Sequence, residues 1–513
     1  MEDLRSWLKR VDARGKLETI SGAGSEDEIG PITEMAARHA GTPVLLFDNI
    51  PGFSPGYRVC SNFNAASFTE DPVMRQALKL GSATSREELF DVLKGREREW
   101  EIGASKYPPK WVEEGPVMEE VLRGDEVDLL RYPSPKWHEL DGGTFIGTAC
   151  VFITQDPDSG AYDFGAFRAQ VFDKRRVGTW IAGRRQAWIN MKKWWAKGKP
   201  SPTLISVGHH PIFIIVASAH SAQVSGGQDF GYLGAMMGEA LPAVKGELTG
   251  LPVPADAELV LEGFIKQGDM MDEGPFGEWT GYYGGTVEPE PYMVVERVYQ
   301  RKDPIILGTA PLKYKYPHTI LPRVGIMARL EAAGVEGVVA VSNHPYGGTL
   351  MAVVKLRQMY AGHVKEVLQM VGGLIRNEAC RWIIAVDEDI DINDWAEVTW
   401  AMASRADPAE DIDIIRRTMS TRLDPMVPAR TTRERSITNR ALIDACIPYE
   451  RFSDPNDNAF GWATMSREMW DKTMAKWGKR LRITEQSKRV GEHFPEVRGI
   501  TEHMGPAGPV MGA

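Results

Sequence analysis

The sequence has few cysteines, no excess of positive charge and no long apolar segment. Its four cysteines, Cys60, Cys150, Cys380 and Cys446, lie far apart in a chain of 513 residues and form no CxxC pair. Neither a zinc site nor a disulfide framework is therefore expected, and four buried thiols are the simpler interpretation.

The best apolar run, Pro211 to Ala219, is far shorter than the roughly 20 residues that a membrane helix needs. The first residues, MEDLRSWLKRVDARGKL, are charged from the second position onward and lack the apolar core of a secretory signal. The formal net charge of −10 argues against a nucleic-acid or anionic-membrane partner. These absences predict a cytoplasmic protein without such partners.

The length predicts several domains, and the pattern of helix-like and strand-like segments changes twice along the chain. Residues 1–122 contain an amphipathic helix pattern from Leu4 to Val11 and a strand pattern at Val44–Phe47, which is typical of an α/β unit. Residues 123–325 are dominated by strand-like runs, among them Ile212–Ala217, with one helical stretch from Arg185 to Trp195. This region predicts a β-rich domain, such as a barrel.

Residues 326–513 alternate strand and helix patterns, which predicts a sheet covered by helices. The stretch Ser466–Leu481 has an apolar face that suits docking either on a second subunit or on its own domain. The Gly/Pro-rich tail Gly505–Ala513 is expected to be disordered.

Two glutamates flank a turn in the segment Glu273–Gly274–Pro275–Phe276–Gly277–Glu278. Proline fixes φ and glycine tolerates unusual backbone angles, so the chain can reverse here and direct both carboxylates into one pocket. Neighbouring carboxylates in a closed site can act as general acids or bases near neutral pH. Without other support, two glutamates beside a turn are more often solvated surface charges.

Three further segments give that support. Asp163 and Arg168 stand five residues apart at the start of an expected strand. A polar, glycine-bearing loop, Trp137–Gly143, precedes another expected strand, and Gly226–Ala235 reads GGQDFGYLGA.

Together these segments resemble the UbiD family of decarboxylases. EGPFGE is the most specific signature of that family. The segments GYLGAMMG, LVLEG, the DGG loop and Pro317–His318–Thr319 also look like family segments in the family's order. The resemblance extends from about residue 4 to about residue 485.

The resemblance implies an α/β (α+β), multidomain protein. Residues 1–122 are expected to form an N-terminal α/β domain, and residues 123–325 a central split β-barrel that binds prenylated FMN. Residues 326–513 are expected to form a C-terminal α/β domain with a terminal helix, which makes the contacts of a homodimer or homohexamer. A flavin prenyltransferase would supply the cofactor.

The family's catalytic trio maps onto Arg168, Glu273 and Glu278. The resemblance implies reversible, non-oxidative removal of CO2 from an aromatic or α,β-unsaturated carboxylic acid through a covalent prenylated-flavin adduct. Arg168 would bind the departing carboxylate, Glu273 would hold Arg168, and Glu278 would donate the proton that replaces CO2.

The site for the cofactor phosphate departs from the family pattern of Asn, His and Glu metal ligands. Those positions are occupied here by Asp163, Gln186 and Asp229, and the family's lysine position falls at Ala396. Two carboxylates and an amide carbonyl can still bind Mn²⁺ or Mg²⁺.

The missing lysine charge can be replaced by Arg184 or Arg185, which precede the expected helix whose N-terminus also favours an anion. Gly165 and Ser218 are expected to be further cofactor-binding positions, and backbone carbonyls near Ala217–Ser221 can hold K⁺ as in relatives.

Two alternatives remain. One is a decarboxylase of an aryl-CoA or phthalate-type substrate, and the other is a flavin-binding paralogue without turnover, which the altered phosphate site favours. His138, His220 and His318 are candidate pocket residues, although a lone histidine is more often structural.

Overall fold

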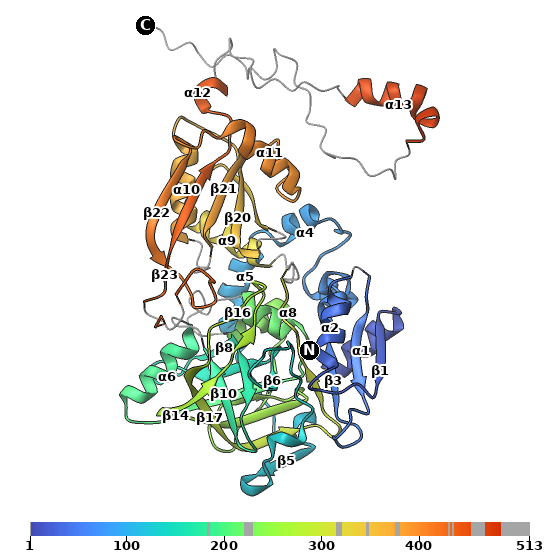
Figure 1. The fold of residues 1–513 in the computed structure, drawn as a ribbon, viewed down its shortest axis with the longest axis vertical. Helices are drawn as coiled ribbons and strands as arrows, with labels where there is room; N and C mark the ends of the chain where they lie inside the picture. Colours follow the sequence, from blue (N-terminus) through green and yellow to red (C-terminus); the bar gives the residue numbers. More distant parts are fainter. Residues whose placement is uncertain are drawn as a thin grey trace. The chain divides into compact units, whose positions relative to one another are not determined.

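A computed structural model describes residues 2–39, 41–181, 185–219, 229–313, 321–344, 348–374, 380–428, 431–432, 435–452 and 467–483. The chain divides into two compact units (Figure 1). The first unit comprises residues 1–328 and 420–437, and the second comprises residues 329–419 and 438–513. The mixed α/β, multidomain fold class is confirmed, while the expected division into three domains stays a prediction.

The beginning of the chain forms a small α/β layer. Helix α1 (Leu4–Ala13) begins where Asp3 accepts a hydrogen bond from the Ser6 backbone N–H at 2.8 Å, and it buries Leu4, Trp7, Leu8 and Val11. The sheet beside it has the order β1-β2-β3-β18. Its strands are β1 (Leu17–Ser21), β2 (Val44–Asp48), β3 (Arg58–Ser61) and β18 (Ile305–Leu307). The last strand arrives from far along the sequence and ties this layer to the rest of the first unit.

Further helices follow this layer. They are α2 (Ile29–Ala37), α3 (Pro72–Ala77), α4 (Arg86–Leu93) and α5 (Arg96–Gly103). A small sheet of β4 (Lys110–Trp111), β12 (Pro242–Lys245) and β13 (Pro252–Pro254) lies in the same unit.

The centre of the first unit is a nine-stranded sheet that curls into a half-barrel (Figure 1). Its order is β6-β9-β10-β17-β14-β11-β7-β8, with β5 paired to β17. The strands are β5 (Glu120–Arg123), β6 (Phe145–Gly147), β7 (Val151–Gln155), β8 (Tyr162–Ala166), β9 (Arg168–Val171), β10 (Arg176–Trp180), β11 (Ser201–Val207), β14 (Leu259–Glu273) and β17 (Glu288–Gln300). Two register shifts between β14 and β17 help the sheet to bend.

Three helices cover or adjoin this sheet: α6 (Gln186–Ala196), α7 (Ile212–Ala219) and α8 (Asp229–Met237). Helix α6 lies against β7, β8 and β11 and confirms the helix expected there. The strand expected at Ile212–Ala217 is wrong, because these residues belong to α7. A short run that is apolar on every side fits a buried helix as well as a buried strand. The ring of His210 accepts a hydrogen bond from the Ile212 N–H at 3.2 Å, at the start of this helix.

The second unit contains a five-stranded sheet of order β19-β20-β21-β23-β22. Its strands are β19 (Val338–His344), β20 (Gly348–Leu356), β21 (Trp382–Asp387), β22 (Ile412–Met419) and β23 (Ile437–Asp444). Its helices are α10 (His363–Leu374), α11 (Trp395–Arg405), α12 (Tyr449–Phe452) and α13 (Arg467–Leu481), and α9 (Leu321–Ala332) spans the boundary between the units. The expected alternation of strands and helices is confirmed, whereas the tail Gly505–Ala513 lies outside the described residues.

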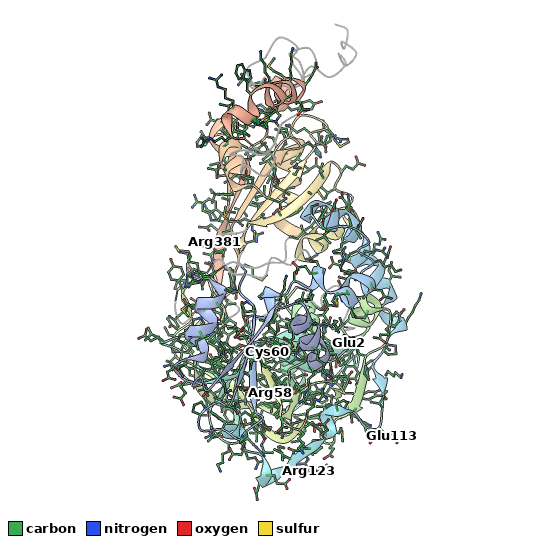
Figure 2. All side chains as sticks on the ribbon, turned by 90° about the vertical axis from the view of Figure 1, so that its right-hand side faces the viewer. Glu2, Arg58, Cys60, Glu113, Arg123 and Arg381 are labelled. Carbon is green, nitrogen blue, oxygen red and sulfur yellow. The ribbon has the colours of Figure 1, made fainter. Side chains whose placement is uncertain are left out.

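The four cysteines are buried and carry free thiols, as expected. Cys60 lies on β3 within the first unit (Figure 2), and burial raises the pKa of its thiol to about 12. No helix among the described residues combines the length and the apolar character needed to cross a membrane.

Candidate active site

The long strand β14 ends at Glu273, and the chain then turns sharply. Gly274 has a φ of +80°, and its bond to Pro275 is cis. The next residues form the two-residue strand β15 (Phe276–Gly277), which pairs with β16 (Tyr283–Gly284). This short hairpin carries Glu278 at its tip, so Glu273 and Glu278 leave the turn on either side of Phe276 and face the same arginine.

That arginine is Arg168, the first residue of β9. Its Nε and Nη2 donate hydrogen bonds to the two oxygens of Glu273 at 2.7 and 2.6 Å. Its Nη1 donates to Glu278 Oε1 at 3.0 Å. The guanidinium also lies over the rings of Trp180 and Phe276, at 4.9 and 5.2 Å from their centroids. Trp180 is the cross-strand partner of Arg168 on β10, so the sheet register itself places this ring.

A second loop holds the turn in place. The N–H of Gly142 donates to the Pro275 carbonyl at 2.8 Å, and Asp141 Oδ1 accepts from the Gly277 N–H at 2.8 Å. Glycine is required at position 142, because an added Cβ would lie 1.9 Å from the Gly274 carbonyl oxygen. The DGG loop of the sequence therefore holds the glutamate turn in position through these two hydrogen bonds.

Two other side chains support the same turn. Gln170, two residues along β9 from Arg168, accepts a hydrogen bond from the Gly274 N–H at 2.8 Å. His138 Nε2 donates to the Pro311 carbonyl at 2.9 Å, and its Nδ1 lies 3.4 Å from Asp141 Oδ2. Burial acts to lower the pKa of His138, but Asp141 outweighs it and the pKa is raised. A protonated His138 is thus favoured beside the turn.

Burial shifts the pKa of the acid at the tip. Glu278 is buried, and burial raises its pKa although the charge of Arg168 acts in the opposite direction. The nearby charge of Glu273 adds to this rise. Burial also opposes the charge of Arg168, but the two glutamates outweigh it and raise the pKa of the guanidinium. The arrangement keeps a permanent cation beside an acid that retains its proton more readily than an ordinary glutamate.

A second buried cluster lies on β8 and α8. Asp163 is buried and hydrogen-bonded to Asp229 and to Thr154, its cross-strand partner. Burial, followed by the charge of Asp229, raises the pKa of Asp163 well above its usual range. Asp229 Oδ2 also accepts from the Phe164 N–H at 2.7 Å. Two carboxylates this close cannot both be charged unless a cation accompanies them.

A hydrogen-bond relay connects this cluster to α6. Thr154 Oγ1 accepts from Asn190 Nδ2 at 3.0 Å, and Asn190 Oδ1 accepts from Gln186 Nε2 at 2.8 Å. The amide oxygen of Gln186 takes no part in that bond. Arg185 is exposed at the start of α6, and its charge acts to lower the pKa of Asp163.

Comparison with known proteins identifies the family. A model described as the 3-octaprenyl-4-hydroxybenzoate carboxy-lyase Rift-related domain matches residues 110–314. The model of the C-terminal domain of the same carboxy-lyases matches residues 316–445. The chain belongs to the UbiD family. It is therefore an enzyme of a decarboxylase family, and the resemblance seen in the sequence is confirmed.

Solved structures of UbiD-class enzymes match almost the whole chain. HmfF from Pelotomaculum thermopropionicum, in complex with FMN, is 27% identical with a TM-score of 0.75, and the match covers 93% of this chain and 100% of that one. Vanillic acid decarboxylase from Sedimentibacter hydroxybenzoicus, in closed form, is 25% identical with a TM-score of 0.79 over 93% and 99% of the two chains. The apo 3,4-dihydroxybenzoic acid decarboxylase of Klebsiella pneumoniae is 21% identical with a TM-score of 0.72 over 91% and 97%, and supports the fold alone.

The UbiD-like positions expected from the sequence fall into three groups. Arg168, Glu273 and Glu278 form one cluster. Asp163 and Asp229 form another, with Gln186 connected through the relay. Arg184, His220 and His318 lie outside the described residues.

The remaining cofactor positions are Gly165, Ser218 and Ala396. Gly165 lies on β8, where an added Cβ would lie 2.1 Å from the ring of Phe167. Ser218 lies on α7, which packs on β8, and its hydroxyl donates to the Ile214 carbonyl at 2.6 Å. Ala396 lies in the first turn of α11, in the second unit.

Sequence reasoning missed Gln170, Trp180 and Arg422. Gln170 had a usable signal, because residues two apart on a strand share a face and Arg168 was already a candidate. Trp180 had no signal in the sequence, because its position opposite Arg168 depends on the pairing of β9 with β10. Arg422, which lies over the ring of Trp180 at 5.1 Å, is more than 200 residues away from Arg168 in the sequence and had none either.

Proposed function

We propose that this UbiD-family enzyme is a reversible, non-oxidative decarboxylase of an aromatic or α,β-unsaturated carboxylic acid, working with prenylated FMN. The observation that supports this most strongly is the cluster of Arg168, Glu273 and Glu278. A guanidinium has five N–H donors, and the hydrogen bonds to the two glutamates use three of them. One donor remains on each terminal nitrogen, which is the number needed to bind a substrate carboxylate.

Glu273 and Glu278 have different tasks in this proposal. Glu273 binds Arg168 through both oxygens and fixes the plane of the guanidinium. Glu278 binds Arg168 through one oxygen, and its raised pKa favours the protonated form. Loss of CO2 leaves excess electron density on the substrate carbon, which then needs a proton. In this proposal Glu278 provides that proton, and its raised pKa supports the assignment.

Prenylated FMN, when bound, supplies the electron sink that this reaction needs. The described residues fit a flavin phosphate that is held through a cation. Asp163 and Asp229 offer buried carboxylate oxygens, Gln186 offers an amide oxygen, and Arg185 adds positive charge nearby. Mn²⁺ and Mg²⁺ prefer such oxygen ligands. K⁺ near Ala217–Ser221 remains part of the proposal.

The second candidate function is flavin binding without turnover. It is favoured by Asp163, Gln186 and Asp229, which replace the Asn, His and Glu of the family pattern. The intact triad of Arg168, Glu273 and Glu278 favours catalysis, because a binding protein has no need of a buried proton donor.

One experiment separates the two functions. The protein is co-expressed with a flavin prenyltransferase, its absorbance spectrum is recorded, and CO2 release is measured with aryl, acrylic, phthalate and aryl-CoA acids. A bound chromophore with CO2 release from at least one acid supports the decarboxylase. A bound chromophore that turns over none of these acids supports the binding protein.

The phosphate site has its own test, with flavin retention as the readout. If a metal ion bridges Asp163 and Asp229 to the phosphate, Asp163→Ala together with Asp229→Ala should release the flavin, and chelation of the wild type should loosen it. If an arginine neutralises the phosphate directly, Arg184→Ala together with Arg185→Ala should release the flavin and chelators should do little. Full retention in all three samples would overturn this assignment of the site.

A homodimer or homohexamer and a cytoplasmic location stay predictions. Helix α13 exposes Met469, Trp477 and Leu481, which suits a subunit contact as expected for its apolar face.

A further inference from the structure

The segment Ser420–Ile437 connects strands β22 and β23 of the second unit but groups with the first unit. Two hydrogen bonds join described residues of this segment: the Ser420 N–H donates to the Ser436 carbonyl at 2.9 Å, and Ser420 Oγ donates to Asp424 at 2.9 Å. Arg422 extends from it to the half-barrel. Arg422 therefore comes from a distant part of the chain and lies beside the candidate active site.

Arg422 binds two glutamates of β17. Its Nη1 donates to Glu288, and its Nη2 donates to Glu290. All three side chains are largely buried, Glu290 almost completely. Two buried carboxylates on one strand need a nearby cation, and Arg422 provides it.

The position of Glu288 connects this ion pair to the catalytic cluster. Glu288 is the direct cross-strand partner of Glu273 in the antiparallel pair of β14 and β17. Directly opposite side chains lie on the same face of a sheet, and like charges there destabilise the pair. Each glutamate has its own arginine: Glu273 binds Arg168, and Glu288 binds Arg422. If Arg422 were absent, Glu288 would become a competitor of Glu273 for Arg168.

Trp180 makes a second connection between the two arginines. The guanidinium of Arg168 lies 4.9 Å from the centroid of its ring, and that of Arg422 lies 5.1 Å from it. A ring held by two cations has little freedom to turn away from either. Next to Arg422, Leu423 lies against Gly284 together with the side chain of Glu278, so the same segment helps to cover the acid.

We propose that Arg422 is a positioning residue of the candidate active site: it neutralises Glu288 and Glu290 and supports Trp180, so that Arg168 stays bound to Glu273 and Glu278. This rests on the proposed function for its effect on turnover. Its effect on the geometry of Arg168 is independent of turnover.

The test compares three variants of the full chain. Arg422→Met removes the charge but keeps an unbranched side chain beside Trp180. A triple variant adds Glu288→Gln and Glu290→Gln, which removes the two carboxylates that Arg422 neutralises. Arg405→Met is the matched control, because Arg405 also binds two carboxylates and lies over a tryptophan, but in the second unit.

Amide hydrogen exchange in peptides that cover residues 163–181 and 270–290 is the first readout. Arg422→Met should exchange faster in these peptides, the triple variant should return toward the wild-type rate, and Arg405→Met should leave them unchanged. With an acid that the wild type turns over, Arg422→Met should lose up to about 100-fold in kcat through misplacement of Arg168. The triple variant should recover most of that loss.

Recovery in the triple variant is the decisive result, because a purely structural anchor would not be restored by removing its partners. Wild-type exchange in Arg422→Met, or a triple variant no better than Arg422→Met, overturns the proposal. If Arg422→Met does not fold, a folded triple variant supports the proposal and an unfolded one overturns it. If the wild type turns over no acid, the exchange data still decide on Arg422, and the proposed function fails separately.

Discussion

Each of the two units contains an arginine that binds two carboxylates and lies over a tryptophan ring. Arg168 in the first unit and Arg405 in the second are two such arginines. Arg405 Nη1 donates to Asp387 at 2.9 Å and Nη2 donates to Asp389 at 2.7 Å, and its guanidinium lies 5.2 Å from the centroid of Trp400. By residue type and contact distance the two clusters are nearly the same.

The two clusters differ in the hydrogen bonds of their acids. Asp387 Oδ2 accepts from Arg405 and from the Ile447 N–H, and its Oδ1 accepts from Gln358 at 2.7 Å, so both oxygens are occupied. For Glu278, the only side-chain hydrogen bond found within the described part of the chain is that of Oε1 to Arg168. Its second oxygen can therefore hold a proton and release it.

They differ also in how the chain assembles them. Asp387 is the last residue of β21, Asp389 follows shortly after the strand, and Arg405 comes 16–18 residues later at the end of α11. Arg168 is separated from Glu273 and Glu278 by 105 and 110 residues. The first arrangement fastens a helix to the strand that precedes it. The second depends on the strand register of the whole half-barrel. It brings together side chains from distant strands and does not join neighbouring elements. A count of charged groups does not distinguish the two clusters, and it is the unused hydrogen-bonding capacity and the long-range assembly of the first that support its proposed catalytic role.

The largest expected effect is the difference in turnover between a variant of Glu278 in the first cluster and a variant of Asp387 in the second. Glu278→Gln should lower turnover roughly 10²–10⁴-fold, because the proposed proton donor is lost while an amide keeps the hydrogen bond to Arg168. Asp387→Asn should leave turnover unchanged. Both variants should retain flavin, so initial rates are measured on flavin-loaded protein at equal occupancy. Turnover at the wild-type rate by Glu278→Gln would remove its role as proton donor.

Part of the first cluster could be predicted from the sequence. The turn from Glu273 to Glu278 was recognisable because glycine and proline mark a reversal and the two acids flank it. Arg168 followed from the family motif around Asp163. These residues form the cluster that was expected, although their roles stay a proposal.

What the sequence could not predict depends on pairing between distant strands. Trp180 faces Arg168 only because β9 pairs with β10, and Glu288 faces Glu273 only because β14 and β17 pair in one register. Arg422 requires in addition that the segment between β22 and β23 groups with the first unit. The helix α7 was mistaken for a strand because a fully buried apolar run has no polar face to reveal its period.

A smaller effect is expected when each arginine is replaced by methionine. Arg168→Met leaves two buried carboxylates without a cation and should cost about 3–5 kcal/mol in the free energy of unfolding. Arg405→Met should cost less, because the side chains of Asp387 and Asp389 are 16% and 26% exposed and water replaces part of the lost interaction. Urea unfolding of both variants at pH 7 measures the difference, and the shift of the transition must be assigned to its unit by hydrogen exchange, since two units need not unfold together. An Arg405→Met variant that loses more than Arg168→Met would contradict the ranking.

The smallest expected effect is a difference between the two units in how they respond to pH. In the second unit, burial and the charge of Asp411 raise the pKa of Asp444 from 3.8 to about 6. Because the folded state binds this proton more tightly than the unfolded state, the contribution of Asp444 to the free energy of unfolding is complete below pH 3.8. This contribution is lost as the pH rises through about 6, and the loss amounts to about 3 kcal/mol. Asp444→Asn should abolish this loss, so the thermal midpoint of the second unit should fall less between pH 4 and 7 than in the wild type.

Turnover should follow a different group, because Glu278 as the proposed proton donor must carry a proton to act. Its pKa is raised by burial, so the rate should fall as the pH rises through that raised value. Since Glu278 belongs to the first unit and Asp444 to the second, Asp444→Asn should change the stability profile and leave the rate profile where it is. Thermal melts and initial rates of wild type and Asp444→Asn between pH 4 and 8 test this. A rate profile that moves with Asp444→Asn would mean that the pH dependence of turnover reports unfolding of the second unit, and the link between the burial of Glu278 and its function as an acid would lose its support.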